Sequence, residues 1–156
     1  MDIKDFLFGE RFTNEDFALF SETELSEIEV LSEKEASNIW YDYCDDEILP
    51  KSSFAIKTGL GKLPLITNDC GWGEEKEEND TGLLIKNTLS KYIDGHINIC
   101  YYSDCALRVS TRLFCEKWSD FCYPSDYLII DFGEKALLYY EDRLFYLDKI
   151  DNTNSQ

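Results

Sequence analysis

Three apolar runs in the C-terminal part of the chain constrain the fold more than any other feature. They read YLIIDF at 127–132, ALLYY at 136–140 and LFYL at 144–147, and they are rich in residues that favour strands. The links between them are only a few residues long, at Gly133 and at residues 141–142. Because parallel strands need a crossover of a dozen or more residues, these runs predict an antiparallel meander.

Helix signals dominate the residues before this meander. Capping boxes, in which a hydroxyl residue is followed three positions later by Glu, begin at Ser21 and Ser32. The second opens the clearest helix, which we expect to end before Pro50. Other expected elements are a strand at 6–12, a helical turn at 13–16, a helix at 81–93, strands at 96–103 and 106–109, and a helix from 110 or 111 through 122. This order predicts an α+β fold, with N-terminal helices followed by a β-β-α-β-β-β segment forming one mainly antiparallel sheet.

The length of 156 residues fits one domain, because the commonest domain size is about 100–150 residues. Aromatic residues make up 15% of the chain, which indicates a folded body. We expect a single domain at 1–150 and a polar tail at 151–156. Within the domain, Gly and Pro residues predict an irregular loop at about 48–80 whose end is acidic.

The formal net charge is −17, and most of the acidic excess lies in the first third of the chain. Residues 1–50 hold 15 acidic and 3 basic residues. A field of this sign repels phosphate backbones and anionic lipid, so we expect neither nucleic acid nor membrane as a partner. The charge favours a cationic partner, and the alternative is that it serves solubility alone.

The six cysteines are expected to be reduced thiols in the cytoplasm. The N-terminal residues MDIKDFLFGE lack the basic and apolar regions of a signal peptide, and there is no CxxC pair. No apolar run approaches the roughly 18 residues that a membrane-spanning helix needs. The cysteines therefore indicate a buried, reduced core rather than a disulfide framework.

The sequence contains no complete catalytic, cofactor-binding or metal-binding motif. Because His96 is the only histidine, sites that need two histidines are excluded. The segment 59–63, GLGKL, lacks the glycine and hydroxyl spacing of a phosphate-binding loop. We expect no cofactor, no metal and no small-molecule substrate, and we infer that the protein is not an enzyme. A carboxylate pair or a cysteine acting with His96 stays open as a catalytic alternative.

Clustered acids and one tryptophan are the candidate partner-binding residues. Trp72 lies between two glycines beside an acidic run, which is typical of an interface anchor, although packing within a loop explains it equally well. The acids are interpreted either as solvated surface or as a docking surface for lysine and arginine. The full candidate set is Asp45, Asp46, Glu47, Trp72, Glu74, Glu75, Glu77, Glu78 and Asp104.

A motif at residues 100–121 carries a family resemblance. The segment Cys100–Asp104 reads CY-x-SD, and Phe114, Trp118 and Phe121 then read F-x3-W-x2-F. This pattern resembles a family of small single-domain bacterial proteins of unknown function. The helix at 36–43 and the aromatic strands ending at 144–145 are similar to that family as well. The resemblance implies a fold of this kind and supplies no catalytic residues.

In overall character the chain is also similar to the immunity proteins of contact-dependent growth inhibition systems. These are small, acidic, cytoplasmic single domains that bind and block a cognate toxin. This similarity implies a protein that covers the active site of a basic toxin domain, plausibly a nuclease, with an acidic surface. The alternatives are a non-catalytic adaptor or scaffold module with another basic partner, and a small enzyme that uses carboxylates or a cysteine with His96.

Overall fold

The structure is a computed structural model, and it describes residues 2–6, 9–13, 20–44, 63–71, 74–122 and 127–149. Its elements, in chain order, are η1 (Ile3–Asp5), α1 (Gly9–Thr13), α2 (Glu22–Leu25), β1 (Ile28–Val30), α3 (Glu33–Trp40), β2 (Leu65–Thr67), α4 (Glu75–Thr88), η3 (Ser90–Tyr92), β3 (His96–Tyr102), β4 (Cys105–Ser110), α5 (Thr111–Glu116), α6 (Trp118–Cys122), β5 (Tyr127–Asp131), β6 (Lys135–Tyr140) and β7 (Arg143–Asp148).

The strands form one seven-stranded sheet in the order β1-β4-β3-β5-β6-β7-β2. Every pairing in it is antiparallel, which confirms the α+β prediction and the meander of β5, β6 and β7. Glu141 and Asp142, between β6 and β7, both have positive φ angles, 44° and 65°. Two consecutive residues of this kind make the tight hairpin turn whose twist matches that of the flanking strands.

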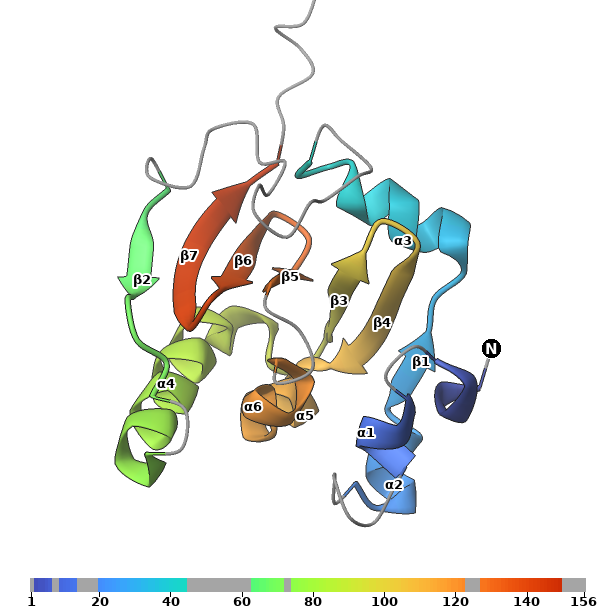
Figure 1. Cartoon of the computed structure of the whole chain (residues 1–156), viewed down its shortest axis with the longest axis horizontal. Coiled ribbons are helices and arrows are strands. Elements are labelled where there is room, and N and C mark those ends of the chain that lie inside the picture. Colours follow the sequence, from blue (N-terminus) through green and yellow to red (C-terminus); the bar gives the residue numbers. More distant parts are fainter. Residues whose placement is uncertain are drawn as a thin grey trace, which may run out of the picture.

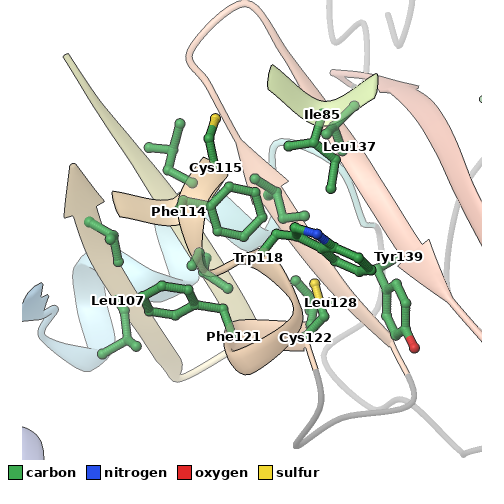
Figure 2. Close-up of a cluster of buried hydrophobic side chains, with 14 of the residues drawn as sticks. Ile85, Leu107, Phe114, Cys115, Trp118, Phe121, Cys122, Leu128, Leu137 and Tyr139 are labelled. Atoms are coloured by element: carbon green, nitrogen blue, oxygen red, sulfur yellow. The ribbon is translucent and has the colours of Figure 1, made fainter. Parts of the chain in front are cut away.

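Helices cover both faces of this sheet. On one face, α4, α5 and α6 contribute Ile85, Phe114, Trp118 and Phe121 to the larger core, which Figure 2 shows packed on Leu128 and Leu137 of the strands. On the other face, α3 contributes Ala36 and Trp40 to a smaller core. Alternate strand residues supply the two cores: Ile99 faces the first and Cys100 the second.

The predicted helix starts at Ser21 and Ser32 are confirmed. In each case the serine hydroxyl accepts a hydrogen bond from the backbone N–H of the glutamate three residues later, and that glutamate's side chain accepts one from the serine N–H. Ser110 caps α5 in a similar way through the backbone N–H of Leu113. Side-chain capping thus begins each of these helices where the sequence pattern indicated.

Several expected boundaries are wrong. The predicted strand at 6–12 includes the short helix α1, because a short apolar run does not by itself separate strand from helix. By contrast, the helix that begins after Ser32 ends at Trp40, before Pro50 as expected. The helix expected from 110 through 122 divides at Lys117 into α5 and α6. The turn expected at 13–16 lies largely outside the described residues.

The expected irregular loop at about 48–80 contains regular structure in its described part. β2 pairs with β7, and α4 begins at Glu75 rather than at residue 81. Carboxylates in the first turn of a helix are stabilised by the partial positive charge of the helix N-terminus, so the acidic run belongs to α4. The same helix ends at Thr88 and is followed by η3, whereas a helix to residue 93 was expected.

None of the helices in the described ranges has both the length and the apolar character needed to cross a membrane.

Candidate functional site

The predicted acidic segment Glu74–Glu78 forms the N-terminal end of α4. Glu74 occupies the N-cap position without a side-chain capping bond, and Glu75, Glu77 and Glu78 lie in the first turn. Glu75 and Glu77 are exposed and Glu78 is half-buried. This helix end therefore presents carboxylates to solvent, as the sequence predicted, on a rigid element rather than on a loop.

Asp104 lies far from this helix end, in the turn between β3 and β4. The acidic turn of α4 follows β2, which is one edge of the sheet, whereas β4 pairs with β1, which is the opposite edge. Figure 1 shows the separation, with β2 and α4 on the left and β1 and α3 on the right. The structure thus does not join these candidate acids into one surface. Asp45, Asp46, Glu47 and Trp72 lie outside the described residues.

A cavity of about 560 Å³ opens beside Asp104. Its walls come from four places in the chain: η1 and the residue after it, β1 and the start of α3, the turn between β3 and β4, and the first residues of β4. The lining residues are Asp5, Phe6, Val30, Leu31, Ser32, Glu33, Glu35, Tyr102, Asp104, Cys105 and Ala106. A pocket of this volume is large enough for a small ligand or for a few side chains of a partner.

Four carboxylates, here called the acidic rim, line this cavity: Asp5, Glu33, Glu35 and Asp104. All four residues are exposed, and the described residues that line the cavity include no basic side chain. None of the four takes part in the ion pairs within the described ranges, which use Glu24, Glu29, Asp42, Asp94, Glu134, Glu141 and Asp148. The acidic rim therefore carries negative charge that no lysine or arginine of the described residues neutralises.

The sequence identified Asp104 but missed the other three rim residues. They come from two separate segments of the chain, and only the packing of η1 and α3 around the hairpin brings them together. Glu35 did carry a signal, because its capping box predicted that it begins a helix, but that signal concerned the fold rather than a site.

Apolar side chains form the rest of the cavity wall. Phe6 is buried and its ring lies 5.7 Å, between centroids, from that of Tyr101 in an edge-on arrangement. Tyr102 is 37% exposed, and its ring meets that of Tyr127 edge-on with an interplanar angle of 90°. Val30 and Leu31 complete this wall. The cavity therefore offers apolar contact beneath a negatively charged rim.

Three contacts hold the rim in place. The hydroxyl of Ser37 in α3 donates to the backbone carbonyl of Ser103 at 2.7 Å, which fastens the helix to the turn. The backbone N–H of Leu31 donates to the carbonyl of Ala106 at 3.0 Å. One carboxylate oxygen of Glu35 accepts from the hydroxyl of Ser32 at 3.1 Å. The rim is therefore built on fixed backbone.

Beside the cavity, a row of polar side chains crosses four neighbouring strands. Glu29, Arg108, Asn98 and Asp131 are direct cross-strand partners in β1, β4, β3 and β5. Arg108 lies 3.6 Å from the carboxylate of Glu29 and donates to Asn98 at 3.1 Å, and Asn98 donates to Asp131 at 3.0 Å. The hydroxyl of Tyr43 also donates to Asp131, which is buried. This row fixes the register of the strands that carry the cavity.

The one thiol in the cavity wall is poorly suited to act as a nucleophile. Burial raises the pKa of Cys105 to about 12, and the negative charge of Asp104 contributes in the same direction. A thiol with such a pKa is protonated at neutral pH, and the thiolate is the nucleophilic form. Within the described ranges, no three His, Cys, Asp or Glu side chains are arranged to hold a metal ion.

A second cavity, of about 300 Å³, lies between α4 and the α5–α6 segment. Glu78 and Glu116 line it together with Lys86 and Arg112, and its apolar wall includes Trp118. Acidic and basic residues are balanced there. This second cavity consequently lacks the uniform charge that distinguishes the first.

Comparison with known proteins identifies one family. A family model described as "Protein of unknown function (DUF2947)" matches residues 1–145. No curated protein matches the chain. No solved structure matches it either.

Proposed function

The chain belongs to the family of proteins of unknown function DUF2947, which assigns it no activity, and we therefore propose a function from its own surface. We propose that it is an immunity protein. It binds a cognate basic toxin domain, plausibly a nuclease, and covers the toxin's active site. The lysines and arginines that hold nucleic-acid phosphates in such a toxin meet carboxylates of this protein instead.

The observation that carries the proposal is the acidic rim. Asp5, Glu33, Glu35 and Asp104 line a cavity whose described lining includes no basic residue, and they stay out of the ion pairs that engage other acids of the described residues. Like charges held close together raise the energy of the free protein, and a cationic partner relieves this repulsion. The first turn of α4 adds a second negative patch that increases the rate of encounter with such a partner.

The test is a co-purification followed by an affinity measurement. The tagged chain is expressed together with the product of the adjacent upstream gene, and the captured protein is identified. Calorimetry then measures the affinity between about 0.05 M and about 0.5 M sodium chloride, because screening shortens the range of charge interactions over this interval. We expect a basic partner whose binding weakens steeply with salt. A neutral or acidic partner, or an affinity that does not change with salt, would contradict the proposal.

An enzymatic assay of the captured partner separates inhibition from mere association. If the partner is a toxin, its activity in vitro falls to background when the chain is present in equimolar amount. A partner that binds with the expected salt dependence and keeps its full activity would instead identify the chain as an adaptor. Cells that express the toxin should survive only when the chain is also expressed.

A further inference from the structure

Resting on this proposed function, we infer that the cavity inside the acidic rim is the docking site for an arginine side chain of the toxin, together with the residues next to it. The inference names the occupant of the cavity, whereas the proposed function requires only a basic partner. Three properties of the cavity carry it: the placement of the charges, the aromatic ring at the rim and the volume.

The rim charges come from separate elements. Asp5 belongs to η1, Glu33 and Glu35 to α3, and Asp104 to the turn between β3 and β4. The cavity is therefore lined by carboxylates from three parts of the fold. A guanidinium group has five N–H donors in a fixed plane, so it can donate to several carboxylates at once, whereas an ammonium acts as a compact point charge.

The aromatic ring at the rim also favours arginine. Tyr102 lines the cavity and is 37% exposed, and because Tyr127 meets it edge-on, the two rings are perpendicular rather than stacked. A planar guanidinium is weakly hydrated and stacks on aromatic faces more readily than an ammonium does. The methylene groups of the arginine stem fit the apolar wall formed by Val30, Leu31 and Phe6.

The volume indicates more than a single side chain. At about 560 Å³, the cavity exceeds one arginine side chain several-fold, so residues flanking the arginine enter as well. An arginine in the middle of a short apolar segment matches both the charged rim and the apolar wall. Such an arginine, buried at the centre of an interface, is typical of the few residues that supply most of a binding energy.

The first experiment uses the free chain and a defined peptide. Capped Gly-Arg-Gly is titrated into isotopically labelled full-length protein, with the lysine and citrulline counterparts as comparisons. We expect resonances of residues 102–106 and of the start of α3 to shift with the arginine peptide, to shift less with lysine and to stay unchanged with neutral citrulline. Equal shifts with all three peptides, or shifts centred on α4, would overturn the inference.

The second experiment uses the captured toxin and two variants with the same change in charge. Glu33→Gln with Asp104→Asn removes two charges from the rim, and Glu75→Gln with Glu77→Gln removes two from the exposed turn of α4. We expect the rim variant to bind at least about tenfold more weakly, mainly through faster dissociation, and the α4 variant to change chiefly the association rate. All four positions are exposed, so both variants should fold, with only a small decrease in melting temperature from the loss of first-turn carboxylates in α3 or α4.

Failure of this inference is distinguishable from failure of the proposed function. If the chain captures a basic toxin and the two variants lose equal affinity, the charge acts only at long range and the docking site is refuted. If no basic partner is captured, the proposed function fails, and the peptide titration still decides whether the cavity selects arginine.

Discussion

The side chain of Ser37 donates a hydrogen bond to the backbone carbonyl of Ser103 at 2.7 Å, across 66 positions of sequence. Ser37 lies in α3 and Ser103 in the turn between β3 and β4, next to Asp104. This bond therefore sets the separation between the two parts of the acidic rim that carry Glu33 and Asp104.

Ser37→Ala tests how much this bond contributes to stability. The substitution leaves the half-buried Ser103 carbonyl without this donor, and we expect the free energy of unfolding to fall by about 1 kcal/mol. Urea denaturation measures the loss. Ser90→Ala is the control, because its hydroxyl bonds to the carbonyl of Asn87 three residues away at an exposed position, so its effect should stay within about 0.5 kcal/mol. Equal losses in the two variants would show that the long-range bond has no special value.

Tyr43→Phe tests the buried end of the polar row. The phenol donates to the carboxylate of Asp131, which is buried and also accepts from Asn98 and from the backbone N–H of Gly133. Removing one donor from a buried charge should cost about 1–3 kcal/mol of unfolding free energy. Tyr92→Phe is a matched control, since its hydroxyl bonds to Glu134 at the surface. A Tyr43→Phe variant as stable as the Tyr92→Phe variant would refute this role for the row.

The sequence predicts the parts of the sheet that rest on local signals, and it misses the features that form only when distant segments pack together. Short apolar runs and the short links between them predicted the meander from 127 onward, because both signals are local. The edge strands β1 and β2 were missed, since each has only three residues and forms by pairing with a distant strand. The other three rim residues were missed for the same reason: Asp5, Glu33 and Glu35 line a cavity with Asp104 only after the sheet and helices have packed.

Glu24 takes part in both a capping box and an ion pair, and two substitutions distinguish these two roles. Its carboxylate accepts from the backbone N–H of Ser21 at 2.8 Å and lies 3.6 Å from the ammonium of Lys117. Gln keeps the capping acceptor, so Glu24→Gln should cost under about 1 kcal/mol, whereas Glu24→Ala should cost about 1–2 kcal/mol. Chemical denaturation measures both. The interpretation fails if the two variants are equally stable.

The same residue predicts a pH dependence on the acid side. The hydrogen bond from the Ser21 backbone N–H is the main cause that lowers the pKa of Glu24 below its usual value of 4.5, and the charge of Lys117 adds to it. Just below pH 4.5 the Glu24 carboxylate binds a proton in the unfolded chain but stays ionised in the folded chain. The stabilisation from Glu24 is thus present above about pH 4.5 and is lost as the pH falls through the folded pKa. Glu24→Gln should flatten this part of the stability profile.

The raised pKa values of the buried thiols predict that the protein also loses stability at alkaline pH. Burial raises the pKa of Cys70 and of Cys105 to about 12, from a usual value of 9.0. Above pH 9 the unfolded chain releases protons that the folded chain retains, so unfolding becomes easier as the pH rises. This contribution is complete below about pH 9 and is lost as the pH rises from there toward about 12. Denaturation at several pH values measures the slope, which Cys105→Ala should reduce; a slope unchanged by that substitution would contradict the assignment.

Alanine substitutions at Gly71 and Gly133 distinguish the cost of backbone strain from the cost of a steric clash. Both have positive φ angles, 75° and 100°, so alanine is strained at either position. A Cβ atom at Gly71 would lie 2.2 Å from the Cβ of Glu77 in α4, whereas one at Gly133 would meet nothing within 4 Å. Gly133→Ala should therefore cost about 1–2 kcal/mol from conformation alone. Gly71→Ala should cost at least about 2 kcal/mol more, because α4 must move away from the segment that follows β2. Thermal and urea denaturation of the two variants compare these costs directly, and similar losses would mean that α4 yields to the added methyl group without strain.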